Sequence, residues 1–390
     1  MENTDALPAP IWVDRPASFQ AMLERLQGEP SLAVDTESNS FYVYEEQVCL
    51  IQISVPGADY LIDPLTLKDL SGLGPLLADP AVLKVLHGAD YDLTVLHRDY
   101  QFTVSNLFDT MWASRILGWP AHGLAALLQE HFGITVNKKY QRANWGIRPL
   151  PPAQIDYARL DTHYLLRLKD LQVKALHEAN RWDQAQHRFA QLAQTRSVPR
   201  EFDPEGFWQM SGARDLDDAG RGVLRELFNF RDHRARLRNR PPFKILSNRA
   251  LLALSEQRPH TLDGLRKVSG VPSWLVQQSG SHMLAAIERG AQHPLAWEDR
   301  PRAQNNREKN QNARPTRECQ ARFEALRAWR NAAAEQREVE PDIVLNNHTL
   351  WAIAQQNPRT LAQLAENDLL AAWQIDEFGQ AVLDVIKNLH

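Results

Sequence analysis

Three short apolar runs follow one another near the start of the chain, and each is typical of a β-strand. They cover residues 31–35, 48–55 and 60–63, and Gly57 marks the turn between the second and the third. The second run, Val-Cys-Leu-Ile-Gln-Ile-Ser-Val, is rich in β-branched residues, which favour strands. Three strands so close together predict an antiparallel meander.

Segments with helical spacing then alternate with short apolar runs. Helices are predicted before and after the meander, at 14–26, 73–77, 91–96, 109–117, 124–132 and 152–177. Further strands are predicted at 82–86 and 102–104. Asp109 is a good N-cap, and Gly133 is a good helix stop. Residues 138–152 are basic, aromatic and closed by prolines, which is typical of a loop. This order of elements predicts an α/β fold, a mixed sheet with helices on its faces.

From residue 215 the pattern is helical, and it repeats at a constant offset of 99 residues without a gap. The matching pairs include Arg231 with Arg330, Pro242 with Pro341, Leu246 with Leu345, Asn248 with Asn347 and Thr261 with Thr360. So many matches at one offset imply two copies of one helical module. The stretch between the copies is rich in Asn, Gln, Arg, Glu and Pro, which favours a flexible or loosely packed linker. We therefore expect domains at residues 1–200, 215–291 and 318–390, with a linker at 292–317.

Composition narrows the class of protein. A chain of 390 residues is long enough for two to four domains. Its net charge of −4 gives no overall indication that the protein binds a polyanion. Cys49 and Cys319 are too few and too far apart for a disulfide framework or a cysteine zinc site. The N-terminus shows no basic-then-apolar signal pattern, and no apolar run reaches the length of a membrane helix. We expect a cytoplasmic protein without a membrane segment.

Four acids and one tyrosine stand at positions that suggest metal chemistry. Asp35 and Glu37 end the first strand and are two residues apart, so they share one face of it. Tyr157 and Asp161 are four residues apart, so they lie one turn apart on one face of a helix. Asp92 lies in another helical segment. Taken singly, each acid is more simply a loop residue, a helix cap or half of an ion pair. Converging acids are what Mg²⁺ or Mn²⁺ requires, and two such ions can catalyse phosphodiester hydrolysis.

Three motifs in order resemble those of the DEDD 3′–5′ exonucleases, in the tyrosine branch that includes ribonuclease D. The first is Asp35-Thr36-Glu37 with residues 48–53, the second is residues 87–93 with Arg98-Asp99, and the third is Tyr157 to Asp161. The resemblance covers roughly residues 10–200 and extends to residues 108–110, 138–141 and 145–150 between the motifs. The two helical modules resemble HRDC domains, which accompany this nuclease in bacterial ribonuclease D. The resemblance implies a ribonuclease H-like nuclease domain.

The resemblance also implies roles for the five residues. Asp35 would bridge two divalent metal ions, Mg²⁺ or Mn²⁺; Glu37 and Asp161 would complete one site, and Asp92 would act on the other through water. Tyr157 would hold the attacking water. An unperturbed tyrosine has a pKa of about 10, so we expect the metal rather than Tyr157 to promote deprotonation. Asp90 is a rival for the role of Asp92, and the spacing from the preceding motif residues favours Asp92.

Two basic regions are candidates for holding a substrate. Residues 138–148 interleave cations with aromatics, and we expect RNA contacts from Lys138, Lys139, Arg142, Trp145 and Arg148. The alternative is a basic loop that packs against its own domain. Residues 221–249 of the first module carry nine basic residues and two acids, whereas residues 322–390 carry six basic residues and ten acids. In the first module we expect RNA contacts from Arg231, Arg234, Arg236, Arg238, Arg240 and Lys244. The alternative there is an ordinary solvated face.

We therefore expect a monomeric, metal-dependent 3′–5′ exoribonuclease that releases 5′-monophosphates from RNA with a free single-stranded 3′ end. By the resemblance, its substrates would be tRNA precursors and other small structured RNAs. Two alternatives stay open. One is a DNA 3′–5′ exonuclease, because the same four acids serve both substrates. The other is a non-catalytic RNA-binding scaffold, against which the presence of all five candidate residues argues.

Overall fold

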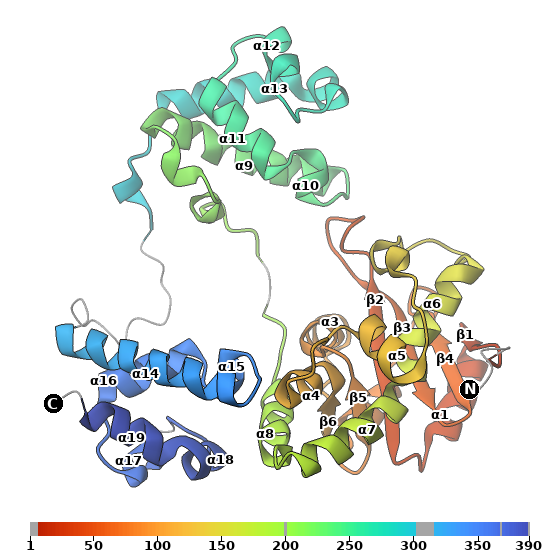
Figure 1. Ribbon diagram of the computed structural model, residues 1–390. Coiled ribbons are helices and arrows are strands. Elements are labelled where there is room, and N and C mark those ends of the chain that lie inside the picture. The colour runs from red at the N-terminus through yellow and green to blue at the C-terminus, as the bar shows by residue number, and fades with distance from the viewer. Residues whose placement is uncertain (1–6, 199–200, 302–315, 367–368, 389–390) are drawn as a thin grey trace. The chain divides into compact units, whose positions relative to one another are not determined.

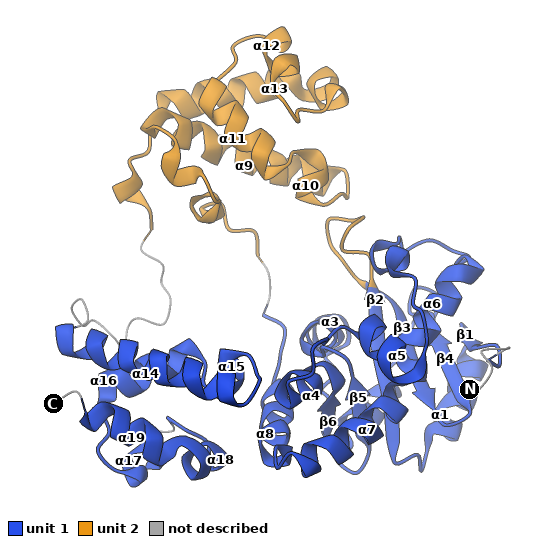
Figure 2. Ribbon diagram, viewed as in Figure 1, with its two compact units in different colours: residues 1–37, 48–198, 312–390 blue, residues 38–47, 199–311 orange. Residues whose placement is uncertain are grey.

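The computed structural model describes residues 7–198, 201–301, 316–366 and 369–388 (Figure 1). Contacts within the chain divide it into two units, each described separately below (Figure 2). One unit contains residues 1–37, 48–198 and 312–390, and the other contains residues 38–47 and 199–311. No helix among the described residues combines the length and the apolar character that a membrane crossing requires.

The first unit is built on a sheet of six strands, in the order β1-β4-β3-β2-β5-β6. The strands are β1 (Ile11–Val13), β2 (Ser31–Ser38), β3 (Val48–Val55), β4 (Ala58–Ile62), β5 (Leu83–Leu86) and β6 (Leu107–Asp109). β3 and β4 form an antiparallel hairpin, with Ile53 opposite Tyr60. The pairs β1–β4, β2–β5 and β5–β6 are parallel. The predicted mixed sheet is confirmed, and β1 is a strand that the sequence pattern did not reveal.

Helices cover both faces of this sheet (Figure 1). The helices of this region are α1 (Pro16–Leu26), α2 (Leu73–Ala78), α3 (Asp90–Tyr100), α4 (Thr110–Leu117), α5 (Leu124–Phe132), α6 (Pro152–His163), α7 (Leu165–Glu178) and α8 (Trp182–Leu192). Because side chains alternate along a strand, Leu32 and Val34 of β2 pack with α1, α2 and α3. Ala33 faces the other way and packs with α4, α7 and α8.

Two local predictions are wrong. The strand expected at residues 102–104 lies instead at β6, and Phe102 and Val104 are buried core residues outside any strand. These two residues are apolar because they are buried in the core, and a residue can be buried without lying in a strand. The long helix expected from Pro152 to His177 is two helices, because Tyr164 separates α6 from α7.

The first helical module belongs to the second unit (Figure 2). Its helices are α9 (Asp218–Leu237), α10 (Pro242–Ile245), α11 (Asn248–Gln257), α12 (Leu262–Lys267) and α13 (Ser273–Gln292). Their core is formed by residues such as Leu227, Leu251 and Met283, all fully buried. The expected linker, residues 292–317, contains a short 3₁₀ turn, Trp297–Asp299, and its residues 302–315 lie outside the described part of the chain.

Residues 38–47 also belong to the second unit, although Ser38 is the last residue of strand β2. The Tyr44 hydroxyl donates to Asp232 Oδ1 at 2.7 Å, and its backbone N–H donates to Asn239 Oδ1 at 3.0 Å. The Phe41 ring lies 6.4 Å from the Phe243 ring. This segment, which we call the 38–47 loop, is thus tied to the first module by aromatic and polar contacts.

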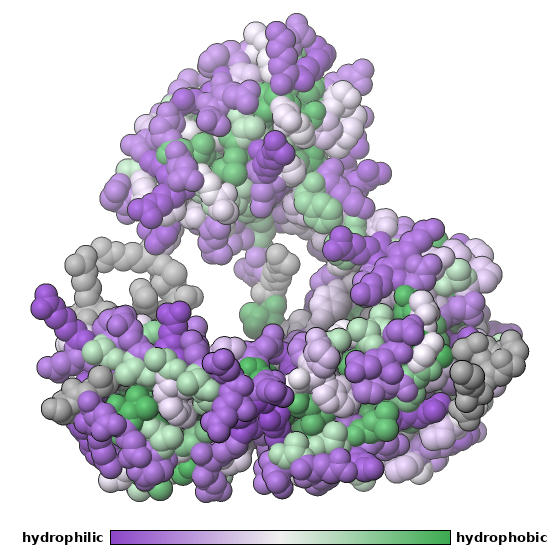
Figure 3. Space-filling model, in the orientation of Figure 1, coloured by the Kyte–Doolittle hydropathy of each residue, from purple (hydrophilic) through white to green (hydrophobic). Residues whose placement is uncertain are grey.

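The second module repeats the first with α14 (Arg317–Gln336), α15 (Pro341–Val344), α16 (Asn347–Gln356), α17 (Leu361–Glu366), α18 (Ala372–Gln374) and α19 (Gln380–Lys387). It docks on helices α4 and α8. The Gln184 side-chain amide donates to the Ile343 carbonyl at 2.8 Å, and Arg115 pairs with both Glu340 and Asp342. Ile343 is buried in the core cluster that contains Phe189. Figure 3 shows hydrophilic residues gathered at this junction on the visible face.

Candidate active site

Strand β2 carries two of the candidate metal ligands at its end. Its buried residues Leu32, Ala33 and Val34 fix the strand inside the sheet, so the polar residues that follow emerge at its edge. Asp35 and Glu37 have the parity of Ala33 and therefore point to the face that α6 also covers. Both are half-buried.

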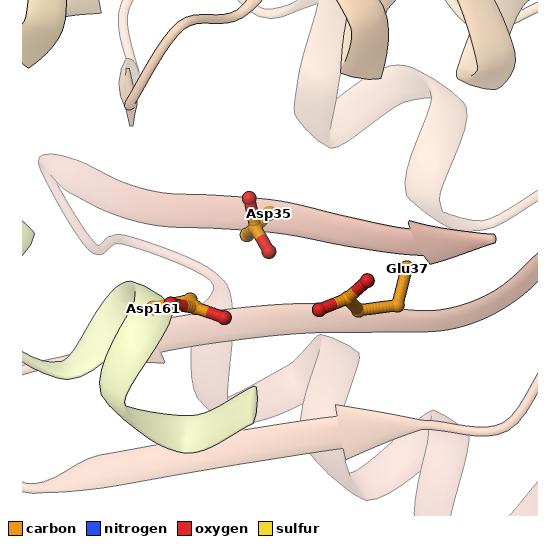
Figure 4. Close-up of side chains that lie close together, drawn as sticks. All are labelled: Asp35, Glu37 and Asp161. Carbon is orange, nitrogen blue, oxygen red and sulfur yellow. The ribbon is translucent and has the colours of Figure 1, made fainter. Parts of the chain in front are cut away.

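Helix α6 brings Asp161 to these two acids. The carboxylate oxygens of Asp35, Glu37 and Asp161 lie within 4.8 Å of one another. Figure 4 shows Asp35 and Glu37 on one strand, with the Asp161 carboxylate directed toward them from the helix. Three carboxylates held this close in a half-buried site repel one another unless a cation lies between them. Their number and hardness fit divalent ions such as Mg²⁺ and Mn²⁺.

Asp92 approaches from the other side of the strand. It lies in the first turn of α3, is 5% exposed, and accepts a hydrogen bond of 2.5 Å from Thr36 Oγ1. Its charge acts on Asp35, Glu37 and Asp161. The rival Asp90 is exposed at the start of the same helix. The charge of Asp92, and not that of Asp90, therefore acts on the other three acids, although Asp92 lies outside the group of three whose oxygens are within 4.8 Å of one another.

The four acids form a cluster of negative charges, and their raised pKa values show that no positive charge among the described residues balances it. Burial raises the pKa of Asp92 to about 7, and burial together with the charge of Asp92 raises that of Asp161 to about 8. The same causes hold the pKa values of Asp35 and Glu37 well above their usual range. Bound cations would lower these pKa values, because their positive charge stabilises the ionised carboxylates.

Tyr157 lies one turn before Asp161 on α6, as the spacing predicts. Its hydroxyl lies near Asp161 and the side chain of Gln141 and interacts with both electrostatically. Its ring packs 6.1 Å from Trp145 and 5.9 Å from Tyr140. Burial and the nearby acids raise the pKa of Tyr157 above its usual value, so the hydroxyl stays protonated at neutral pH and serves as a donor.

A buried carboxylate that the sequence marks only as a helix cap also supports the site. Asp109 caps α4 by accepting from the N–H groups of Met111 and Trp112. It also accepts from the backbone N–H groups of Gly88 at 3.1 Å and Ala89 at 2.7 Å, just before α3. Asp109 thus ties the starts of two helices together and fixes the turn that leads to Asp92.

A second supporting network lies behind Asp161. Asp59 accepts a hydrogen bond of 2.7 Å from Ser54, and its carboxylate lies 2.8 Å from His163 Nδ1. Ser54 Oγ is also 2.7 Å from Thr162 Oγ1. These bonds fix the last turn of α6 against the β3–β4 hairpin. Sequence reasoning missed this network because its hydrogen bonds join residues up to 108 positions apart.

The basic loop splits into a structural part and an exposed part. Arg148 forms a bidentate ion pair with Asp63, with both N–O distances 2.7 Å, and donates to the carbonyls of Cys49 and Trp145. Trp145 is 1% exposed, so its ring packs beneath Tyr157 rather than presenting a face to a base. Both residues are therefore corrected from RNA contacts to packing of the loop. Lys138, Lys139 and Arg142 are exposed.

The basic residues of the first module also differ in their surroundings. Arg231 is 7% exposed and donates to Asn248 Oδ1 at 2.7 Å, so the expectation that it contacts RNA is corrected to a structural role. Arg236 donates to the Tyr44 hydroxyl, and Lys244 lies 4.0 Å from the centre of the Tyr42 ring. Arg238 lies 4.4 Å from the centre of the Trp274 ring. Arg234 is half-buried, and Arg240 is exposed.

Comparisons with known proteins agree with this geometry. Residues 10–175 match the 3′–5′ exonuclease family DNA_pol_A_exo1, and residues 221–287 and 320–386 each match the HRDC domain. The exosome complex exonuclease RRP6 of Saccharomyces cerevisiae is 35% identical over 297 residues, which cover 72% of this chain and 40% of the yeast protein. This chain thus spans about two fifths of that relative's length.

Solved structures show the same architecture. The catalytic core of RRP6 from Trypanosoma brucei superposes with a TM-score of 0.67 at 29% identity, over 74% of this chain and 81% of that core. Escherichia coli RNase D, an exoribonuclease involved in structured RNA processing, superposes with a TM-score of 0.65 over 97% of this chain and 99% of its own. At 21% identity, this second likeness supports the fold alone.

Proposed function

We propose that this chain, which carries a DEDD 3′–5′ exonuclease domain followed by two HRDC domains, is a metal-dependent 3′–5′ exoribonuclease. One observation carries the proposal. Asp35, Glu37 and Asp161 converge within 4.8 Å from β2 and α6, while Asp92 adds its charge from α3. Four acids from three elements form a site for hard divalent cations, and such sites hydrolyse phosphodiesters.

The residues divide naturally between holding cations and positioning water. Asp35, Glu37, Asp92 and Asp161 would hold two divalent ions, Mg²⁺ or Mn²⁺. When bound, such ions lower the pKa of a coordinated water and stabilise the charge that develops on the phosphate and the leaving oxygen. Tyr157 keeps its proton because burial and the acids raise its pKa, so it orients the attacking water as a hydrogen-bond donor. The side chains of Gln141 and Asp161 lie next to this hydroxyl and interact with it electrostatically.

The substrate in this proposal is RNA with an unpaired 3′ end, with tRNA precursors as the expected natural class. Exposed cations in both basic regions support it, because phosphate contacts supply affinity without reading sequence. The proposed contacts are the exposed Lys138, Lys139, Arg142, Arg236, Arg240 and Lys244, together with the half-buried Arg234 and Arg238. The yeast relative is described as an exosome exonuclease, so precursors trimmed from their 3′ ends are suitable test substrates.

The decisive experiment digests a 3′-tailed tRNA precursor and a matched DNA oligomer in the presence of Mg²⁺ or Mn²⁺. We expect stepwise shortening of the RNA and release of 5′-monophosphates. Asp35→Asn and Asp161→Asn should each lower the rate by at least about a thousandfold, because each removes a charge that holds the catalytic cations. Asp156→Asn, on an exposed side chain of the same helix, is the matched control. Unchanged trimming by the first two variants would refute the mechanism, and faster digestion of DNA would refute the substrate.

Stability against pH tests the anionic cluster independently of activity. The pKa values of Asp92 and Asp161 in the folded protein, about 7 and about 8, exceed the unfolded value of about 4. The folded state therefore binds more protons over this window, and the metal-free domain loses stability as pH rises from about 4 to about 8. We expect EDTA-treated protein to melt several degrees lower at pH 8 than at pH 6 and Mg²⁺ to restore more stability at pH 8. A melting temperature that rises with pH in EDTA would contradict the cluster.

A further inference from the structure

Thr36 is a polar residue of the site to which the chemistry proposed above gives no task. Asp35 and Glu37 flank it on strand β2, and side chains alternate along a strand, so Thr36 points to the opposite face of the sheet from these two acids. Helix α3 helps to cover that face, and Thr36 is 6% exposed there. A buried hydroxyl of this kind requires a hydrogen-bond partner.

The partner is the fourth acid of the site. Thr36 Oγ1 donates to Asp92 Oδ1 at 2.5 Å, across 56 positions of the sequence. Asp92 is itself 5% exposed, so water competes little for this bond. Hydrogen bonds to an ionised carboxylate are among the stronger ones, and they restrict its orientation. The bond therefore links the strand that carries two metal ligands to the side chain of the ligand on α3.

The charges around Asp92 show what this bond opposes. Burial and the charge of Asp109 raise the pKa of Asp92, whereas the Thr36 hydroxyl lowers it by stabilising the ionised form. The charge of Asp92 in turn raises the pKa values of the other three acids, so Asp92 and these acids repel one another. Because Thr36 lies between Asp35 and Glu37 in the strand, its bond draws the Asp92 carboxylate toward β2 against this repulsion.

Two contacts fix Asp92 at different levels. Asp109 accepts from the backbone N–H groups of Gly88 and Ala89, so it fixes the turn before α3 but leaves the Asp92 side chain free to rotate. Thr36 holds the carboxylate itself through Oδ1. The second carboxylate oxygen, Oδ2, takes no part in this bond, so it is the atom that can serve a cation or a water on that cation.

We infer that Thr36 is a positioning residue, whose hydroxyl fixes the Asp92 carboxylate for the cation that Asp92 serves. The inference rests on the proposed function, which gives Asp92 a role in holding one of two divalent ions. Groups that hydrogen-bond to the ligands of a metal orient these ligands, and their loss typically weakens metal binding or activity about 10-fold to 100-fold. The group formed by Asp35, Glu37 and Asp161 does not depend on this bond, so its own cation should be affected less.

Two variants separate the hydroxyl from the rest of the side chain. Thr36→Val replaces the hydroxyl with a methyl group, and Thr36→Ser keeps it. In digestion of a 3′-tailed RNA, we expect Thr36→Val to need about tenfold more Mn²⁺ for half-maximal rate and to recover most of the rate at saturating Mn²⁺. The KM for RNA should stay within about twofold, because Thr36 touches no substrate in this mechanism. Thr36→Ser should resemble the wild type in both respects.

Thr66→Val is the matched control. Thr66 Oγ1 donates to Asp63 Oδ2 at 3.0 Å, so this variant also loses a Thr–Asp hydrogen bond, but one that involves none of the four acids. We expect its Mn²⁺ dependence to equal that of the wild type. A rise in the Mn²⁺ requirement of both Thr→Val variants would overturn the specific role of Thr36.

Two readouts do not depend on nuclease activity. Calorimetric titration of the full chain with Mn²⁺ should show weaker binding in Thr36→Val and unchanged binding in Thr36→Ser and Thr66→Val. In EDTA, amide hydrogen exchange in residues 90–96 should be faster in Thr36→Val than in the wild type, because the bond that ties the start of α3 to β2 is lost. Unchanged Mn²⁺ binding in Thr36→Val would overturn the inference.

The failure of the proposed function and the failure of this inference are distinguishable. If the wild type leaves RNA intact, the proposed function fails, and the Mn²⁺ titration still decides the role of Thr36. If the wild type digests RNA and Thr36→Val shows the same Mn²⁺ dependence, the role of Thr36 fails alone. A loss of rate that saturating Mn²⁺ does not recover, or that Thr36→Ser shares, would show a general structural defect and would also overturn it. If Thr36→Val fails to fold, Thr36→Ala, which also lacks the donor, takes its place.

Discussion

The two HRDC modules share an internal framework and differ in what they contact. Arg231 donates to the Leu246 carbonyl and to Asn248, and Arg330 donates to the Leu345 carbonyl and to Asn347. The two Arg–Asn distances are both 2.7 Å. These buried bonds join the long helix to the start of the third helix in each copy. The residues that form these bonds are among those that match at an offset of 99 residues.

Backbone conformation follows the same repeat. Asn239 and Glu338 occupy equivalent positions after the first helix, with φ of 44° and 54°. Arg258 and Asn357 are equivalent helix ends, with φ of 46° and 51°. Left-handed residues at matching places show that the repeat copies the chain path even where the side chains differ.

The modules diverge in the turn between their first and third helices. In the first module this turn carries Phe243 and Lys244, which contact the 38–47 loop. The equivalent residues of the second module, Asp342 and Ile343, contact helices α4 and α8. One surface of a common scaffold is thus adapted to two contacts by changing a few side chains.

The largest effect should come from placing a charge at the turn of the second module. Ile343→Asp puts a carboxylate into a core position that is 6% exposed, and we expect a loss of about 3 kcal/mol in urea unfolding. Its matched partner, Lys244→Asp, is exposed and should cost less than about 0.5 kcal/mol. Equal losses of unfolding free energy in the two variants would show that the turn of the second module is no more buried by its contacts than the turn of the first.

The shared framework predicts equal, intermediate effects. Arg231→Leu and Arg330→Leu each leave buried acceptors without their donor, and we expect each to lose about 2 kcal/mol. Urea unfolding followed by circular dichroism measures both. A large loss in one variant and none in the other would show that the two bonds are not equivalent.

RNA binding should distinguish the two surfaces by a smaller amount. Arg240 of the first module and Arg327 of the second are both exposed. We expect Arg240→Gln to weaken binding of single-stranded RNA about fivefold and to reduce the salt slope by about 1. Arg327→Gln, in the acidic module, should change neither. Fluorescence anisotropy over a series of salt concentrations makes the measurement, and equal effects would assign RNA contacts to both modules.

The smallest effect should be that of the 38–47 loop. Tyr44→Phe removes the hydroxyl that donates to Asp232 and accepts from Arg236, and keeps the ring. We expect a loss of about 1 kcal/mol in the loop's attachment, seen as faster amide exchange in residues 40–46. Unchanged exchange there would show that ring packing alone holds the loop.

Local pattern was sufficient for most elements of the fold. The apolar run at residues 48–55 is β3, and the helix predicted at 124–132 is α5 with Gly133 at its end. Local pattern was insufficient where buried apolar residues lie outside a strand. Phe102 and Val104 have the apolar pattern of a strand but pack in the core outside any strand. It also did not reveal the break at Tyr164, because the apolar periodicity runs on across it.

The candidate site shows the same division. Spacing placed Asp35 with Glu37 and Tyr157 with Asp161, since a strand and a helix each fix which residues share a face. Residue type and spacing could not separate the exposed lysines of the basic loop from Arg148, which forms a partly buried ion pair with Asp63. The sequence alone does not tell whether a lysine or arginine pairs with a phosphate of the substrate or with a carboxylate of the protein that is distant in sequence.

By itself, the sequence determined the order of the elements, the repeat and the identity of the acids, because these follow from local periodicity and residue type. Only the tertiary structure decided which groups meet across long separations. It brought the 38–47 loop to the first module and Ile343 to the nuclease core. The physical reason is that burial and pairing depend on all elements that surround a residue, and no local pattern encodes that environment.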